Sequence, residues 1–364
     1  MSADTVANGP VMRCPSCRAR FRPPPGCTVD ERVHCPHCGA KVRLDLEVLI
    51  GSVVDGWQVE KRLGKGSMGT VFRVRGHHQG AETLAAMKVL NPRSARDKEL
   101  RSRFEREIHL CQNLSHPGLV ACLAVGEHQQ LPYLVMELVE GIPLDRVVDR
   151  SGAMDPRKAT ALIAQVAEVL AYLQRHSIVH RDVKPENIMV DRSHRAKLID
   201  MGFAKDRSSA DAEVQQLTLE GTALGSPAYM APEQVRDSAT ATEATDCYGL
   251  GATYYHLVTG CLPYDGSNAI QVMQTILREA PPSPRQIRPQ LPVGVAAAVT
   301  WMMARDPLQR PASMEDLLPH LQRLRRDPHA AGGIPSGGIC RTWYWWLAAL
   351  AVVVLVALAI MYLR

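Results

Sequence analysis

The sequence has no large excess of charge of either sign. Its 42 lysines and arginines face 37 aspartates and glutamates, and a formal net charge of +5 over 364 residues gives no argument for nucleic-acid binding. Residues 1–13 also lack an apolar run, so no secretory signal peptide is expected. The bulk of the chain is therefore expected in a reducing compartment, where scattered single cysteines serve mostly as small buried apolar residues.

The composition is that of a globular protein, with 46% hydrophobic and 22% charged residues. A chain of 364 residues exceeds one ordinary core, so we expect a two-lobed domain with additional segments. The pattern of residues places the boundaries of the successive parts at 11–45, 53–325, 326–342 and 343–363.

Four of the ten cysteines form two CxxC pairs near the start of the chain, Cys14 with Cys17 and Cys35 with Cys38. Four thiolates at this spacing can form the tetrahedron that zinc prefers, and the metal would supply the folding energy of so short a segment. Residues 11–45 therefore predict a zinc ribbon of two small hairpins. A redox pair or a disulfide-stapled knot is the disfavoured alternative in a reducing compartment. Three spare donors are expected to be solvated rather than ligating: His34, His37 and Cys27.

A glycine-rich segment follows Leu63, with Gly64, Gly66 and Gly69 in the order GxGxxG before Val71. Alone, this pattern is compatible with a dinucleotide fingerprint, but that motif requires a helix after the glycines, and here a strand is expected. A strand, a glycine loop and a second strand form a hairpin whose backbone N–H groups can approach nucleotide phosphates.

The segment from His180 to Asn187 reads HRDVKPEN and follows an apolar run. Phosphoryl transfer needs an aligned hydroxyl and neutralised phosphate charge more than covalent help. Asp182 can accept the hydroxyl proton, Lys184 can steady the moving phosphoryl group and Asn187 can hold a magnesium ion. An HRD triplet alone predicts no more than a salt-bridged turn, whereas the full string resembles the catalytic loop of protein kinases.

The resemblance covers roughly residues 53–325 and implies an α+β, bilobal protein kinase fold with a β-rich N-lobe and a helical C-lobe. It implies ATP and magnesium as cofactors, with Asp200 and Asn187 on the metal. Lys88, by itself compatible with an edge residue in water, resembles the lysine that grips the α/β-phosphates. Its implied ionic partner is Glu107 on a helix expected over 97–114, with Glu105 as the competing candidate. The other implied nucleotide contacts are Leu63, Gly64, Gly66, Gly69, Val71, Ala86, Glu137, Val139 and Met189.

The same resemblance assigns further roles. The backbone of Glu137 and Val139 is expected on the adenine edge, with Met136 guarding a back pocket. Met201 stands where the family usually has phenylalanine, and this difference concerns the active–inactive switch rather than the chemistry. The expected structural ties of the C-lobe are Asp246 to the catalytic loop, Arg310 to Glu233, and Tyr248 in place of the usual tryptophan.

Residues 203–224 resemble an activation loop, which the segment GSPAYMAPE closes. Lys184 and Ser226 together resemble the serine/threonine rather than the tyrosine class. Arg181 can pair with a phosphate in this loop, so autophosphorylation there, in a homodimer, is expected. The candidate acceptors are Thr218 and Thr222, followed by Ser208 and Ser209.

After Arg326 a glycine-rich linker, 326–342, leads to residues 343–363, which carry no charge and cover about 30 Å as a helix, one bilayer core. Aromatic residues mark its ends and basic residues precede it. The segment therefore predicts a single transmembrane helix that contacts the lipid bilayer and keeps the kinase cytoplasmic. Almost no chain follows, which predicts no external sensor domain. A buried core helix is disfavoured by the glycine tether.

These features together predict a membrane-anchored bacterial serine/threonine protein kinase with a structural zinc ribbon and protein substrates. The rival from another class is a pseudokinase scaffold that recruits partners to the membrane, which the intact set of catalytic residues disfavours. A second rival makes the ribbon a nucleic-acid or metal sensor, but residues 11–45 have few aromatics for base stacking. Gly51 and Gly56 predict a loosely joined ribbon that the chemistry does not need.

Overall fold

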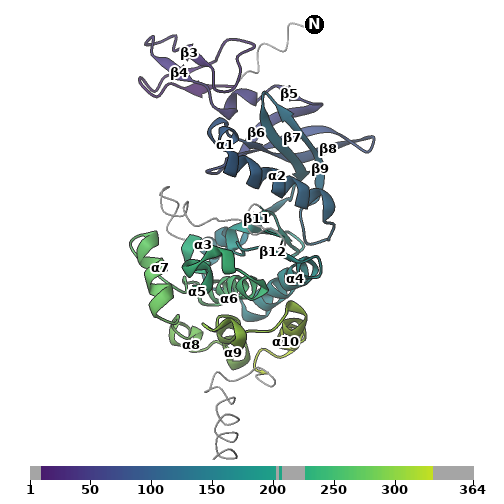
Figure 1. The fold of residues 1–364 in the computed structure, drawn as a ribbon, viewed down its shortest axis with the longest axis vertical. Helices are drawn as coiled ribbons and strands as arrows, with labels where there is room; N and C mark the ends of the chain where they lie inside the picture. The colour runs from purple at the N-terminus through teal and green to yellow at the C-terminus, as the bar shows by residue number, and fades with distance from the viewer. Residues whose placement is uncertain (1–9, 202–204, 207–225, 331–364) are drawn as a thin grey trace, which may run out of the picture.

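The computed structural model describes residues 10–201, 205–206 and 226–330 (Figure 1). Three parts follow one another along the longest axis of the molecule: a small cysteine-rich module, a β-sheet lobe and a helical lobe (Figure 1). The two-lobed α+β architecture predicted from the sequence is thus confirmed. Within the described ranges, no helix has both the length and the apolar character to cross a bilayer, and the stretch 343–363 lies outside them.

Two short antiparallel hairpins build the cysteine-rich module, which we call the ribbon (residues 11–45). Its elements are β1 (Met12–Arg13) with β2 (Arg20–Phe21), and β3 (Arg32–His34) with β4 (Lys41–Arg43). Apolar residues of these strands alternate inward, and basic residues or a histidine occupy the outward positions. A short 3-10 helix, η2 (Leu46–Leu49), then leads into the next part.

Six antiparallel strands form the sheet of the N-lobe in the order β5-β6-β7-β8-β10-β9. Their bounds are β5 (Val53–Val54), β6 (Trp57–Lys65), β7 (Gly69–His78), β8 (Ala81–Leu90), β9 (Cys122–His128) and β10 (Leu131–Glu137). Two helices, α1 (Pro92–Arg96) and α2 (Lys98–Asn113), pack on this sheet (Figure 1). Helix α2 begins at Asp97, whose side chain accepts hydrogen bonds from the N–H groups of Glu99 and Leu100.

The ribbon and the N-lobe share apolar core residues, so the expected loose connection is wrong. Val29 of the ribbon and Leu49 of η2 are 9% and 4% exposed and belong to the same buried cluster as Trp57. Gly51 and Gly56 have φ angles of +90° and +87°, so they serve turns rather than a flexible hinge. The junction is a packed contact because apolar side chains from both parts fill one core.

The helical C-lobe is built around α4 (Pro156–Arg175) and α6 (Glu243–Thr259), which contact each other. Nearly every residue of α6 is buried, which places this helix at the centre of the lobe. The remaining helices are α3 (Leu144–Ser151), α5 (Pro232–Arg236), α7 (Ala269–Arg278), α8 (Pro284–Ile287), α9 (Val293–Met302) and α10 (Met314–Arg326). The short strands are β11 (Gly141–Pro143), β12 (Ile178–Val179), β13 (Ile188–Asp191), β14 (Ala196–Leu198) and β15 (Lys205–Asp206). The 3-10 turns are η3 (Pro185–Asn187), η4 (Ser226–Tyr229), η5 (Ser238–Thr240) and η6 (Pro307–Gln309).

Candidate active site

The glycine-rich turn joins β6 to β7 in the N-lobe sheet. Gly66 N–H donates to the carbonyl of Gly69 at 2.9 Å, which closes the turn. A Cβ atom on Gly69 would lie 2.3 Å from the carbonyl oxygen of Val89, whereas one on Gly64 would meet nothing within 4 Å. Gly69 is therefore required by the close approach of β7 to β8, whereas the space around the Cα atom of Gly64 is open.

Lys88 of β8 lies at the centre of a charged group beneath this turn. Its Nζ is 2.7 Å and 2.8 Å from the two carboxylate oxygens of Glu107 on α2, and 3.4 Å from Oδ1 of Asp200. The competing Glu105 instead pairs with Arg101 on the surface of the same helix. Burial opposes the charge of Lys88, but the carboxylates of Asp200 and Glu107 outweigh it and raise the pKa of the ammonium group. Lys88 is therefore held as a cation.

The catalytic-loop residues converge in the C-lobe. Lys184 Nζ lies 2.7 Å from Oδ2 of Asp182, and Asn187 donates from Nδ2 to the same oxygen at 2.9 Å. Asn187 Nδ2 also donates to the backbone carbonyl of Asp182, which fixes the orientation of the amide. Burial would lower the pKa of Lys184, but the carboxylate of Asp182 prevails and raises it. The loop thus presents a carboxylate, a cation and an amide oxygen within one turn.

Asp246, on the buried helix α6, holds the backbone of this loop. Its two carboxylate oxygens accept hydrogen bonds from the N–H groups of His180 at 2.8 Å and Arg181 at 2.7 Å. Arg181 has a φ angle of +68°, a conformation that residues other than glycine adopt rarely. Gln234 donates to the carbonyl of the same residue at 2.7 Å. The position of the loop is therefore set by the C-lobe core.

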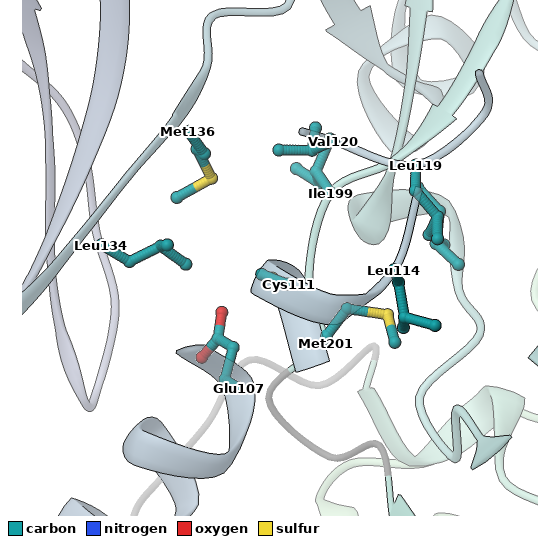
Figure 2. Close-up of a pocket in the computed structure, with 10 residues that line it drawn as sticks. Glu107, Cys111, Leu114, Leu119, Val120, Leu134, Met136, Ile199 and Met201 are labelled. Atoms are coloured by element: carbon teal, nitrogen blue, oxygen red, sulfur yellow. The ribbon is translucent and has the colours of Figure 1, made fainter. Parts of the chain in front are cut away.

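An apolar back pocket lies behind Met136, between the sheet and α2. Leu134 and Met136 point into it from β10, and Val120 and Ile199 line the opposite side (Figure 2). Met201, which stands where the family usually has phenylalanine, is 5% exposed and lines the floor of the pocket. A flexible methionine thus fills the space beneath α2 while Asp200 stays near Lys88.

The adenine-binding residues expected from the sequence come from several strands of the N-lobe sheet, with Leu63 on β6, Ala86 on β8 and Glu137 at the end of β10. Ala86 and Met136 are buried at 7% and 8% exposure, and Leu63 is exposed. Sequence reasoning missed one contact here, the ion pair between Lys197 Nζ and Glu137 Oε2 at 2.5 Å. It joins β14 to the end of β10.

A buried ion pair supports the segment that closes the activation loop. The guanidinium of Arg310, whose side chain is 0% exposed, donates to both carboxylate oxygens of Glu233 at 2.6 and 2.8 Å. Its Cζ atom also lies 4.9 Å from the centroid of the Tyr248 ring. The structure thus brings together the pair expected from the sequence. The expected phosphate acceptors Ser208, Ser209, Thr218 and Thr222 lie outside the described residues.

Comparison with known proteins decides the family. A family model described as "Protein kinase domain" matches residues 57–321. The chain belongs to the protein kinase family. The chain is 33% identical over 271 residues to the serine/threonine-protein kinase PrkC of Bacillus subtilis, and 34% identical over 285 residues to PknH of Mycobacterium bovis. These matches cover 74% and 78% of this chain but only 41% and 46% of the two relatives.

A solved structure shows the same fold. The kinase domain of PknI from Mycobacterium tuberculosis, in a double-mutant form, superposes with a TM-score of 0.59 at 25% identity. The match covers 76% of this chain and 98% of that structure. The bilobal kinase fold is therefore supported by sequence and by shape.

The donor atoms fit the cofactors that this family implies. The carboxylate of Asp200 and the amide oxygen of Asn187 are the hard oxygen donors that magnesium prefers. Because the amide nitrogen of Asn187 is engaged by Asp182, its oxygen remains for a cation. Magnesium bound to ATP phosphates would neutralise the charge that develops during transfer.

The four ribbon cysteines form a cluster whose geometry fits zinc. All four sulfur atoms lie within 4.8 Å of one another, with Cys14 to Cys38 at 3.7 Å and Cys17 to Cys35 at 3.8 Å. Zinc–sulfur bonds of about 2.3 Å in a tetrahedron give sulfur–sulfur edges of roughly 3.8 Å. The spare donors His34, His37 and Cys27 are not members of this cluster.

Proposed function

We propose that this protein transfers the γ-phosphate of ATP to serine and threonine hydroxyls of protein substrates. The convergence of Asp182, Lys184 and Asn187 on one loop carries the proposal. The hydrogen bonds from Lys184 and Asn187 both use Oδ2 of Asp182, so we assign Oδ1 as the atom that accepts the hydroxyl proton. Lys184 steadies the transferring group as a cation, and Lys88 grips the α/β-phosphates while Glu107 fixes its position.

The test is phosphate transfer by the purified chain with ATP and magnesium. We expect label on serine or threonine, in a generic protein substrate or in the chain itself. Asp182→Asn should reduce transfer by at least about 100-fold because the hydroxyl loses its proton acceptor. The matched control is Asp191→Asn, which removes a carboxylate whose contacts lie in the β13–β14 turn. ATP binding without any transfer would instead favour a scaffold.

We also propose three features of the whole protein. One zinc ion is bound by the four ribbon cysteines, in support of which their sulfur spacings match a tetrahedron. The kinase phosphorylates its own activation loop between residues 203 and 224, with Thr218 and Thr222 as the foremost acceptors and Arg181 as the phosphate partner. Residues 343–363 anchor it in the cell membrane with the kinase domain on the cytoplasmic side, supported by their uncharged length.

Each feature has its own measurement. Elemental analysis should find one zinc per chain, and the Cys17→Ser, Cys38→Ser double variant should lose it. Mass spectrometry of active protein should locate phosphate between residues 203 and 224. Removal of residues 331–364 should move the kinase out of the membrane fraction, and retention there would contradict the anchor.

A further inference from the structure

One contact between the ribbon and the N-lobe lies just before helix α2, the helix that carries Glu107. Asp30 of the ribbon accepts a hydrogen bond from Nη2 of Arg96 at 2.6 Å through Oδ2, and from Arg43 through Oδ1. The side chain of Asp30 is 19% exposed, and its φ angle is +74°. One ribbon carboxylate thus joins a ribbon strand to helix α1 of the N-lobe.

Arg96 is the last residue of α1, and the next residue is the N-cap of α2. Asp97 follows it directly and accepts from the N–H groups of Glu99 at 3.0 Å and Leu100 at 3.1 Å. A helix moves largely as one body, so the position of its first turn sets the position of its later turns. Glu107 lies on the same helix and holds Lys88. Asp30 therefore acts on the nucleotide-gripping pair through the start of α2.

A second ribbon contact supports the strand beside α2. The N–H of Val29 donates to Oε1 of Gln129 at 2.9 Å, and the Val29 side chain lies in the N-lobe core. Gln129 is in the turn between β9 and β10, and β9 is itself tied to α2 by the ion pair of Glu127 with Arg101 at 2.6 Å. The ribbon thus contacts both the segment before α2 and the hairpin next to it.

We propose that the ribbon is a built-in clamp that positions α2, with Asp30 and Arg96 as positioning residues for ATP binding. The inference rests on the kinase activity proposed above, and its first test does not depend on zinc. Molecules in which α2 moves away lose the grip of Glu107 on Lys88. Because only the remaining fraction binds ATP productively, the apparent affinity falls while saturating ATP restores turnover.

The first test compares Arg96→Ala with Arg96→Lys in the full chain. Arg96 is exposed at 69% of its side chain, so neither change threatens the fold. We expect Arg96→Ala to raise the KM for ATP by up to about fivefold with little change in kcat, the range of an exposed ion pair. Hydrogen exchange over residues 98–113 should quicken in parallel. Arg96→Lys should recover most of the loss, and the neighbouring control Lys98→Ala should match the wild type.

The second test asks whether Arg96 acts through the ribbon. The Cys17→Ser, Cys38→Ser chain, shown by elemental analysis to lack zinc, should have a raised KM for ATP. Adding Arg96→Ala to that chain should then have no further effect, because the clamp is already lost. An equal effect of Arg96→Ala in both backgrounds would overturn the proposal. So would a wild-type KM and wild-type helix exchange for Arg96→Ala in the zinc-loaded chain. A chain without phosphate transfer but with the exchange differences intact would refute the function and not the clamp.

Discussion

Asp246 holds the catalytic loop through two backbone N–H groups, those of His180 and Arg181. Arg181 has a φ angle of +68°, a conformation in which a side chain crowds the backbone. Such a conformation persists only while its surroundings hold it, and it costs about 1–3 kcal/mol. A single carboxylate in the C-lobe core therefore keeps the proton acceptor of the active site in place.

Asp246→Asn replaces one accepting oxygen with an amide NH₂ that faces an N–H donor. One of the two hydrogen bonds is lost, and Asp182 shifts with the loop. We expect kcat to fall by about 10–100-fold, the effect of a misplacement near 1 Å. Steady-state kinetics with saturating ATP measures it. Asp265→Asn, which changes an exposed loop carboxylate bonded to Gly266 N–H, is the control, and a kcat within about twofold of wild type for Asp246→Asn would contradict the role.

The pair of Glu233 and Arg310 makes a prediction about stability and pH. Burial works to raise the pKa of Glu233, but the hydrogen bond from Arg310 prevails and holds it below its usual value. Since the folded pKa is lowered, the contribution is complete above the unfolded pKa of about 4.3 and is lost as the pH falls through the folded value. Glu233→Gln should therefore reduce the free energy of unfolding by about 3 kcal/mol at neutral pH, because Arg310 stays buried and charged.

Urea unfolding of both proteins between neutral and acid pH checks this. The difference in the free energy of unfolding between the wild type and Glu233→Gln should stay constant down to about pH 5 and become smaller below that pH. Glu315→Gln removes the partner of Arg175 in an exposed ion pair, and this control should change stability by less than about 0.5 kcal/mol. A Glu233→Gln protein as stable as that control would refute the argument.

Contacts between residues that are close in the sequence could be predicted from it, whereas contacts between distant residues were harder to predict. Asp182, Lys184 and Asn187 lie within one short loop, so their spacing already indicates their convergence. The pair of Lys88 and Glu107 was expected from the resemblance to protein kinases, whose spacing favoured Glu107 over Glu105. The pairs Lys197–Glu137 and Arg96–Asp30 were missed, since nothing in the local pattern of either partner indicates which distant residue the fold brings close.

At the scale of elements, the approach of β7 to β8 constrains the glycine-rich turn. Thr70 and Val71 pair with Val89 and Lys88 across these strands, so the turn and the gripping lysine belong to one ladder. A Cβ atom on Gly69 would collide with the backbone of β8 rather than with a movable side chain. The position of Lys88 therefore depends on a glycine in the neighbouring strand.

Gly69→Ala should lower the free energy of unfolding by about 1–3 kcal/mol, the effect of forcing a methyl group into packed structure. Gly64→Ala is the matched control, because its added methyl meets nothing within 4 Å, and it should lower stability by less than about 1 kcal/mol. Denaturant unfolding of the two variants measures the difference. Equal stability would show that β7 moves away from β8 without loss.

The helices were predictable where end signals and periodicity agree. The helix expected over 97–114 is α2 at Lys98–Asn113, which starts after the aspartate cap Asp97. The junction was not predictable in the same way. Glycines at Gly51 and Gly56 are compatible with a flexible hinge or with tight turns, and only the packing of Val29 and Leu49 distinguishes the two.

At the scale of the whole molecule, the ribbon and the N-lobe are joined by one buried cluster. Leu49→Ala should lower the free energy of unfolding by about 2–4 kcal/mol, the effect of a buried leucine, while zinc content stays unchanged. Val53→Ala is the control on the same segment, because Val53 is 59% exposed and should contribute less than about 0.5 kcal/mol. Denaturant unfolding with elemental analysis checks both. A Leu49→Ala chain as stable as the Val53→Ala control would instead support a loose connection between the ribbon and the N-lobe.

The region of sequence similarity and the packed unit of this protein do not have the same limits. The region that matches the family runs from 57 to 321, yet Leu49 before it and Leu324 after it are fully packed, and Val295 N–H bonds to the carbonyl of Pro328. A fragment limited to residues 57–321 would lack Leu49 and Leu324 and would therefore expose apolar core residues at both ends. The region that matches the family model is thus shorter than the unit that packs around these cores. Because Val29 and Leu49 pack in the same cluster as Trp57, neither the ribbon nor the N-lobe can be replaced without repacking the core that they share.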